Sequence, residues 1–539
     1  MHAHRIIQNL LDTKCGEIHA KRRGCIAKVA EAGRIGGLGV VKMGRCLDTK
    51  TSIRHRIKCC DRLLSNRHLP AERLTIFRAL DEAVLAGHRH IAISVDWSGL
   101  LPDGSLHLLR AAVTVKGRAL VLYEEVHAEC DLGSTKVHRR FLETLCSLLP
   151  DQCLPILVTD AGFRATWFKL ATGMHISWVG RIRNRDMVCA EGSGRWDGCK
   201  TWYAGATAKP RCLGRFEYAR ANATPCQLVL YKKAPQGRHH RTSFDKKTMS
   251  SNSKKNRAAQ VEPWLLAVSP DLEALSARQV VEIYAGRMQI EQTFRDVKNA
   301  QWGMALSESQ TRAPQRLEVL LMLGALIGYA LWLIGLAAAS AGYHINYGNT
   351  KKSGPTLSIL TLARHYLTDC VRPQLDHHAF QLALLTLINL VQVVKICGEG
   401  SGSDPVFWQQ VIGNGLWKTK NPPDASRAGL HHAQRATRAA RALLSGVLSR
   451  QGLDGGSQAA LVASGLVLVD DFLVSDAVDG RHGLLEDLRS SGLVASLDGL
   501  FDGLDCGTQS RALSRVVCVL LDCLTSALAR LCGICHGIS

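Results

Sequence analysis

Two short apolar segments that each end in an aspartate constrain the fold of this chain more than any other feature. The first, IAISVDWS, contains Asp96, and the second, PILVTDAGF, contains Asp160. Apolar runs of this length between turn signals are typical of buried strands. Between them, residues 105–115 and 118–126 alternate like two strands joined by a tight turn, and residues 134–149 have the periodicity of an amphipathic helix.

The order of these elements predicts the centre of the fold. A short helix around residues 164–170 and a strand at 176–183 follow the second apolar segment. Three meandering strands, then helix, strand, helix and strand, with a carboxylate ending the first and fourth strands, is the layout of a ribonuclease-H-like nuclease core. We therefore predict an α/β fold built on such a core. Each aspartate alone is weak evidence, because aspartates at strand ends are also common turn residues.

A helix further along the chain supplies a third carboxylate. Residues 275–300, LSARQVVEIYAGRMQIEQTFRDVKNA, carry a stripe of side chains spaced 3, 4, 3 and 4, which places them on one side of an α-helix. An ordinary solvated face with ion pairs would have the same spacing. The long uncharged stretch that soon follows indicates instead that the helix enters the core. The stripe consists of Tyr284, Arg287, Glu291, Phe294 and Lys298.

Asp96, Asp160 and Glu291 would together form a cage of hard oxygen ligands suited to Mg²⁺ or Mn²⁺. Three carboxylates cannot lie close together and all ionise unless a cation is nearby. Two such ions would activate water or a 3′-hydroxyl and stabilise the leaving oxygen at phosphorus. Arg287 and Lys298 would then bind neighbouring phosphates, and the phenol of the stripe would donate a hydrogen bond.

These motifs resemble those of the DDE transposases of the IS-four insertion-sequence family, relatives of the Tn-ten and Tn-five transposases. The segments 55–69 and 109–125 are also similar to this family, and the resemblance runs from about residue 15 to about residue 398. The residues that carry it are VDWS with Asp96, TDAGF with Asp160, and the signature Y-x-x-R-x-x-x-E-x-x-x-x-x-x-K at Tyr284, Arg287, Glu291 and Lys298.

The resemblance implies cut-and-paste transposition. Members of this family bind the inverted repeats at transposon ends, pair the ends in a synaptic homodimer and nick one strand. The free 3′-hydroxyl then forms a hairpin, which is resolved before strand transfer into target double-stranded DNA. The resemblance also implies a tryptophan that stacks on a flipped base, and Trp264 is the matching position. A tryptophan of the core is the alternative interpretation of Trp264.

Residues 1–85 are predicted to form a helical, basic DNA-binding domain. Two short helical patterns lie on either side of the turn DTKT. On the second pattern, Arg54, Lys58 and Arg62 recur every four residues and therefore share one face. This favours a helix-turn-helix-like unit that lays a basic helix on DNA. A solvated basic face would have the same pattern, and both interpretations stay open.

The remaining chain divides by composition. We expect the first part of the core at 86–183, a β-rich insertion at 184–270 and the completion of the core, with the catalytic helix, at 271–400. The basic run GRHHRTSFDKKTMSSNSKKNR within the insertion is typical of a mobile loop or a phosphate-contacting arm. Residues 319–339 carry no charge and are long enough to span a bilayer. A single such stretch next to a basic helix favours a helix buried in the core.

The charge of the chain indicates a polyanionic partner. Its 539 residues, enough for two to four domains, carry a formal net charge of +21 with a pI near 9.4. Residues 1–400 hold 55 Lys and Arg against 33 Asp and Glu, whereas residues 401–539 hold 12 against 13. The positive excess therefore lies in the first 400 residues. Nineteen cysteines without a secretory start or zinc-finger spacing are expected to be reduced, which favours the cytoplasm.

Residues 401–539 depart from the family pattern. Beyond Lys420 the chain has no Lys, Met, Trp or Tyr for 119 residues, and it lacks helical or strand periodicity. We interpret this segment as a disordered or out-of-frame extension and not as a functional domain. The motif CGICH at Cys532–His536 spells a c-type haem attachment site, but haem attachment needs export, so chance explains it better.

Three functions stay open on the sequence alone. They are an active transposase, another metal-dependent nuclease on the same core such as a resolvase, and a decayed transposase that binds DNA without cutting it. The stripe from Tyr284 to Lys298 argues against the second function. The presence of all three acids disfavours the third, although the atypical extension keeps it open.

Deleting residues 401–539 is expected to leave cleavage at transposon ends intact, because every candidate site residue lies before this segment. The truncated and full-length chains would be compared for binding and cleavage of a labelled end duplex. A truncated protein that binds the ends but does not cut them would contradict this expectation.

Overall fold

The computed structural model describes residues 3–394, except 116, 184–185, 234–249, 252–261, 302, 349–356 and 373. Several expectations from the sequence lie outside the described residues. They concern the extension 401–539 with its motif Cys532–His536, and the basic run at 237–257 apart from residues 250 and 251.

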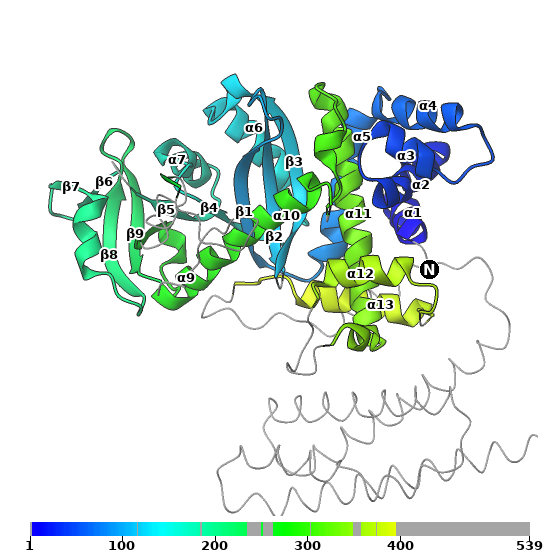
Figure 1. Ribbon diagram of the computed structural model, residues 1–539. Helices are drawn as coiled ribbons and strands as arrows, with labels where there is room; N and C mark the ends of the chain where they lie inside the picture. Colours follow the sequence, from blue (N-terminus) through cyan, green and yellow to red (C-terminus); the bar gives the residue numbers. More distant parts are fainter. Residues whose placement is uncertain are drawn as a thin grey trace, which may run out of the picture. The chain divides into compact units, whose positions relative to one another are not determined.

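Residues 3–84 form five helices that precede the sheet (Figure 1). The third and fourth lie where the sequence predicts two helices around the turn DTKT. Arg54, Lys58 and Arg62 are all exposed on the fourth helix, as their common face requires. The helices are α1 (Ala3–Lys14), α2 (Ala20–Gly36), α3 (Val40–Cys46), α4 (Ile53–Leu64) and α5 (Leu69–Val84).

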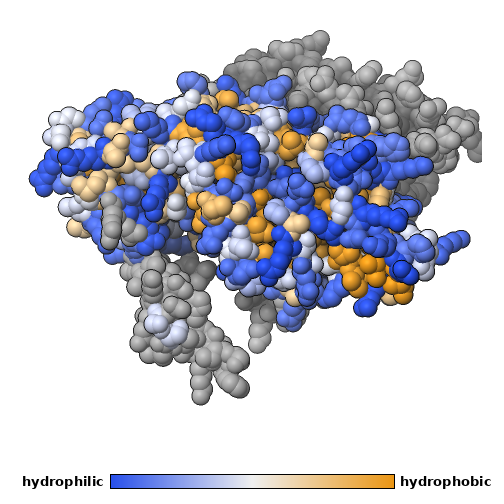
Figure 2. All heavy atoms as spheres, turned by 90° about the horizontal axis from the view of Figure 1, so that it is seen from above, coloured by the Kyte–Doolittle hydropathy of each residue, from blue (hydrophilic) through white to orange (hydrophobic). Residues whose placement is uncertain are grey.

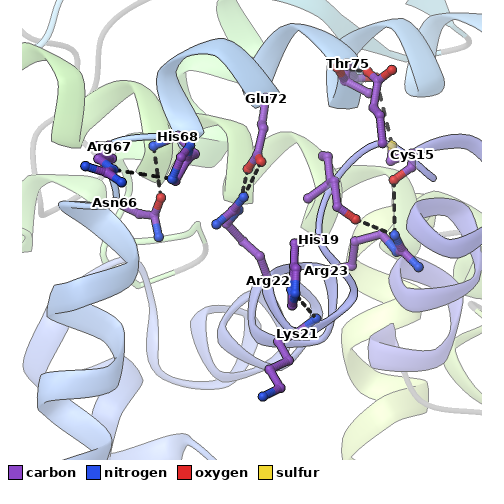
Figure 3. A network of polar contacts seen from close by, with 12 residues as sticks. Cys15, His19, Lys21, Arg22, Arg23, Asn66, Arg67, His68, Glu72 and Thr75 are labelled. Carbon is purple, nitrogen blue, oxygen red and sulfur yellow. Dashed lines mark hydrogen bonds and ion pairs between the residues drawn. The ribbon is translucent and has the colours of Figure 1, made fainter.

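A polar network joins the beginning of α2 to α5 (Figure 3). Arg22 donates two hydrogen bonds to the carboxylate of Glu72, at 2.5 and 2.6 Å. The neighbouring Arg23 donates to the backbone carbonyls of Cys15 and Ile18. His19 caps α2, since its Nδ1 accepts a hydrogen bond from the next-but-one backbone N–H. The turn between α1 and α2 is thereby held against α5.

Ten strands form one mixed sheet in the part of the chain that the structure describes, in the order β3-β2-β1-β4-β5-β10-β9-β8-β6-β7. β1 and β3 pair antiparallel with β2, whereas β4 is parallel to both β1 and β5. This arrangement is consistent with the expected ribonuclease-H-like core. The strands are β1 (His90–Gly99), β2 (Leu106–Val115), β3 (Arg118–Ala128), β4 (Leu154–Thr159), β5 (Ser177–Ile182), β6 (Met187–Ala190), β7 (Trp196–Gly198), β8 (Arg211–Tyr218), β9 (Thr224–Tyr231) and β10 (Trp264–Val268).

The region expected as a β-rich insertion contributes strands to this same sheet. β9 pairs antiparallel with both β8 and β10, and β10 pairs antiparallel with β5. The strands β6 to β9 therefore extend the core sheet sideways. Short 3-10 helices lie between these strands and elsewhere, namely η1 (Glu129–Asp131), η2 (Cys199–Gly205), η3 (Arg220–Asn222), η4 (Pro270–Leu272), η6 (Leu306–Glu308) and η7 (Tyr343–Tyr347).

Helices cover both faces of the sheet. α6 (Thr135–Leu148) and α7 (Ala165–Gly173) pack on one face, where the Trp97 indole of β1 donates to His138 of α6 at 3.2 Å. α9 (Ala277–Gly286) packs on the other, where Ala92 of β1 and Val158 of β4 share an apolar cluster with Val281. Because successive side chains of a strand alternate between faces, the even-numbered positions of β1 and β4 face α9.

The predicted catalytic helix is interrupted. α9 ends at Gly286, a 3-10 turn η5 (Arg287–Gln289) follows, and α10 (Ile290–Lys298) then begins. The Gly286 carbonyl accepts a hydrogen bond from the Thr114 hydroxyl of β2 at 3.2 Å. The Ile290 N–H bonds instead to the carbonyl three residues back, at Arg287. Competition from β2 for one backbone acceptor thus accounts for the tighter turn, and a single continuous helix was the wrong expectation.

The uncharged stretch at 319–339 lies within α11 (Pro314–Ser340). This helix is long and apolar enough to cross a membrane, but 89% of its most apolar window is buried among the described residues, as expected of a core helix.

On the face seen in Figure 2, apolar side chains form separate patches among hydrophilic ones. α12 (Ile359–Thr368) and α13 (His377–Asn389) pack against α11.

One continuous apolar core joins the first helices to the sheet. It includes Ile7 of α1, Ile26 of α2, Phe77 of α5, Val113 of β2 and Leu323 of α11. α11 contacts α1, α2 and α5 on one side and β3 on another. The apolar core does not end near residue 85. The predicted boundary of a DNA-binding domain at this position therefore stays a prediction about function and is not a boundary of packing.

The buried Asp81 of α5 gives a test of the packing. Neither of its carboxylate oxygens has a hydrogen-bond partner among the described residues, and burial, with a smaller effect of Glu82, raises its pKa well above 3.8. The folded state therefore keeps a proton that the unfolded chain releases above about pH 4, so this group lowers stability as pH rises. We expect Asp81→Asn to raise the melting temperature by a few degrees at pH 8 and little at pH 4.

Thermal denaturation at both pH values checks this expectation. The exposed Asp151 provides a matched control, since Asp151→Asn should give no gain that depends on pH. An equal gain from Asp81→Asn at pH 4 and pH 8 would mean that packing, and not ionisation, is responsible.

Candidate catalytic site

Asp96 and Asp160 are brought together by the pairing of their strands. β1 and β4 are parallel, with Val95 opposite Thr159. The next residue after each member of this pair is one of the two aspartates, Asp96 within β1 and Asp160 just beyond the end of β4. Asp96 is an even-numbered position of β1 and lies on the face that α9 and α10 cover. Asp160 is close enough to act electrostatically on Asp96 and on Arg287.

The strand β1 does not end at Asp96, as the sequence analysis expected. It continues for three residues to Gly99 because its antiparallel pairing with β2 continues, through Trp97 opposite Leu109. β1 therefore extends beyond the residues that pair with β4. The position of Asp96 relative to Asp160 is set by the end of the parallel pairing and not by the end of β1.

Arg287 links two of the three acids. Its Nη1 donates to Oδ2 of Asp96 at 3.1 Å, and its Nη2 donates to Oε1 of Glu291 at 3.1 Å. Arg287 is only 5% exposed and belongs to the 3-10 turn before α10. The third acid, Asp160, accepts a hydrogen bond from the backbone N–H of Gly162 at 2.8 Å. A carboxylate from β1 and one from α10 thus share one guanidinium.

The three acids act on one another electrostatically. Burial raises the pKa of Asp96 to about 7; Arg287 opposes this rise, while Asp160 and Glu291 add to it. Burial by itself would lower the pKa of Arg287, but Tyr284 and the three carboxylates raise it. Two carboxylates contact the guanidinium of Arg287 and a third acts on it at longer range, so the acids outnumber this cation.

This charge and its donors fit a divalent cation in their chemistry. Carboxylate oxygens are the ligands that Mg²⁺ and Mn²⁺ prefer, and a bound cation would oppose the burial and the neighbouring carboxylates that raise the pKa of Asp96. However, within the described ranges no three His, Cys, Asp or Glu side chains are gathered closely enough to hold a metal ion. The link through Arg287 takes the place of direct contact between Asp96 and Glu291.

Two aromatic rings, Tyr284 and Trp264, follow Arg287 in a row of contacts. Its guanidinium carbon lies 5.9 Å from the ring centre of Tyr284, which is buried, and burial raises the pKa of this phenol. The ring of Tyr284 meets that of Trp264, edge to face, at 4.9 Å. Trp264 opens β10 and is partly exposed, and the ring of Tyr231 also meets its indole edge to face, at 5.7 Å.

Lys298 at the end of α10 is tied to β1. Its Nζ donates to the hydroxyl of Ser98 at 2.7 Å and to the carbonyl of Gly99. The same ammonium lies 5.7 Å from the ring centre of Phe294. Burial lowers its pKa, and Arg110 lowers it further. Side-chain contacts thus link Tyr284, Arg287 and Glu291 across the break in the helix, and a separate contact links Phe294 and Lys298.

The basic residues of the N-terminal helices are not brought to this site. Arg54, Lys58 and Arg62 lie on α4, which packs against α2, α3 and α11. Lys58 pairs with Asp61 of the same helix at 3.3 Å. Arg54 and Arg62 lie one turn before and one turn after Lys58 and complete the exposed basic face. Any role of this face in binding DNA is separate from the three acids.

Sequence reasoning missed one cation near the acids. The positive charge of Arg181 on β5 lowers the pKa of the Tyr284 phenol. Arg181 is itself paired with Glu262, whose carboxylate lies 3.3 Å from its Nη2. Its signal in the sequence was a charge inside an apolar strand, ISWVGRIR. Such a charge is costly to bury unless it is paired, so it marks a position that has a partner.

Comparison with known proteins bears on this geometry. Residues 109–327 match the model of the transposase DDE domain family. The match supports a DDE transposase. It includes Asp160 and the whole stripe around Glu291, and it begins on β2, after Asp96. No curated protein matches the chain.

Proposed function

We propose that this chain is a cut-and-paste DNA transposase of the IS-four family in which Asp96, Asp160 and Glu291 are the catalytic residues. The observation that carries the proposal is the link through Arg287, which joins carboxylates from distant parts of the chain on one face of the sheet. The match to the transposase DDE domain supports a DNA-acting protein of the cytoplasm. Its substrates would be transposon ends and target double-stranded DNA, bound by a homodimer.

The three acids would hold Mg²⁺ or Mn²⁺, two ions in this proposal. When bound, such ions lower the pKa of water and stabilise charge at phosphorus. The protein itself supplies the arrangement of the carboxylates, since the buried Arg287 bridges Asp96 and the more exposed Glu291. Partial removal from water strengthens the charge interactions within the site.

The neighbouring side chains would bind the DNA. Arg287 carries positive charge between Asp96 and Glu291, and Lys298 carries it beside Ser98 and Gly99 at the end of β1. Both charges are suited to the phosphates beside the scissile one. Tyr284 and Tyr231 both meet the indole of Trp264 edge to face, and its exposed part would stack on a flipped base. Arg54, Lys58 and Arg62 would contact the phosphates of the end sequence.

Exchanging one carboxylate for its amide tests the catalytic assignment. Glu291→Gln is expected to lower nicking of a labelled duplex, carrying the DNA that flanks the gene, by at least about 100-fold in Mg²⁺. The same exchange at Glu282, nine residues earlier and exposed at the surface, is the matched control and should nick like the unaltered chain. Binding of the duplex should persist in both variants.

The outcomes separate the alternatives. Glu291→Gln protein that nicks at the normal rate would refute the assignment. Binding without cleavage by the unaltered chain would favour a decayed transposase. Cleavage without hairpins or strand transfer would favour another ribonuclease-H-like nuclease.

Trp264→Ala is expected to retain the first nick and to lower hairpin formation roughly 10-fold or more, because stacking on a base is worth ~1–3 kcal/mol. Trp264→Phe keeps an aromatic face and should retain most hairpin formation. Single-turnover assays that resolve nicked and hairpin products make the comparison. If Trp264 only fills the core, both steps would fall together with the melting temperature.

A further inference from the structure

A row of charged side chains crosses the sheet beside the proposed site. Asp96 of β1 is directly opposite Arg110 of β2, and Arg110 is directly opposite Glu124 of β3. Residues directly opposite each other in neighbouring strands point to the same face. The row therefore lies on the face of the sheet that α10 covers, and Asp96 is its first member.

The guanidinium of Arg110 joins β3 to α10. Its Nε and Nη2 lie 2.7 and 2.6 Å from one carboxylate oxygen of Glu124, and neither side chain is exposed by more than 1%. Its Nη1 donates to the hydroxyl of Thr293 at 3.0 Å, and its carbon lies 4.8 Å from the ring centre of Phe294. The guanidinium of Arg110 thus contacts β3 of the sheet through Glu124 and α10 through Thr293.

Thr293 ties this contact to the position of Glu291. Its hydroxyl accepts from Arg110 and donates to the carbonyl of Ile290 at 2.7 Å, so it is fixed to the first turn of α10. Glu291 lies in that same turn. Since the backbone of Arg110 is opposite Asp96, the hydrogen bond sets how far α10 is displaced along the sheet relative to Asp96.

We propose that Arg110 is a positioning residue, which holds Glu291 in register with Asp96. The inference rests on the proposed function, because it concerns the same three acids. It adds a requirement that the acids by themselves do not reveal, namely a buried cation on the neighbouring strand.

Packing and stability alone do not account for this pair. Two charges removed from water lose hydration that their attraction barely restores, and apolar side chains in their place are often neutral or stabilising. The buried Ile290, Phe294 and Val297 pack α10 against the core. A cavity of about 50 Å³ lined by Arg110, Thr293 and Val297 nevertheless leaves this packing incomplete beside the pair. The directional hydrogen bond between Arg110 and Thr293 supplies a constraint on the helix that such packing does not.

Two substitutions at Thr293 test the contact without disturbing the ion pair. Thr293→Val keeps the shape and removes the acceptor, whereas Thr293→Ser keeps the hydroxyl. We expect the valine variant to lower the single-turnover rate of nicking in Mg²⁺ about tenfold, with unchanged affinity for the end duplex. The serine variant should nick within about twofold of the unaltered chain.

Hydrogen–deuterium exchange supplies a measurement that does not depend on activity. In Thr293→Val, exchange should quicken in peptides covering residues 290–298 and stay the same in α1, α2 and the outer strands. A merely structural role would instead quicken exchange throughout the chain and lower the melting temperature. That result would overturn the proposal, as would a valine variant that nicks and exchanges normally.

The double variant Arg110→Met with Glu124→Leu removes both charges and leaves no unpaired one. It is expected to fold with a melting temperature close to that of the unaltered chain, and to lose nicking at least as strongly as Thr293→Val. A double variant that folds and nicks normally would also overturn the proposal. Failure of the proposed function would give a different result, because the unaltered chain itself would then not nick the duplex. The local change in exchange of Thr293→Val would still show whether Arg110 positions α10.

Discussion

The parallel pairing of β1 with β4 is the constraint on which the rest of the site depends. Val95 lies opposite Thr159, so the following aspartates meet at one place and on one face. A slip of one residue would send Asp160 to the opposite face, against α7. Apolar side chains fill both faces of these strands, including Ile93 and Val158, and this two-sided burial is what specifies the register.

The charges around this pairing show how the protein holds three partly exposed acids near one another. Arg287 comes from a 3-10 turn that exists because β2 competes for a helical carbonyl. The same strand carries Arg110, which faces α10 two residues from Glu291. β2 therefore shapes both the turn that supplies the bridging arginine and the helix that supplies the third carboxylate.

Periodicity in the sequence was enough to predict the local elements, including β1 to β5, α6, α7 and the stripe around Glu291. It could not predict contacts between distant residues. The strand LHLLRAAVTV displays a charge at Arg110, but its partners lie 14 and 183 residues further along. The break at Arg287 depends on the hydroxyl of Thr114, 172 residues before the carbonyl that it binds. The continuation of the sheet through β6 to β9 likewise follows from long-range pairing that no local pattern encodes.

The helix α11 has a consequence for how such a protein can change during evolution. It is apolar on all sides and lies between the first helices and the sheet, so its residues serve two partners at once. Leu323 and Ile327 cannot be adapted to one partner without affecting the core that both share. The N-terminal helices are thus not an exchangeable cassette. Under the proposal that α4 contacts the DNA ends, a new end specificity would arise more readily from substitutions on the exposed face of α4 than from replacing α1 to α5 as a block.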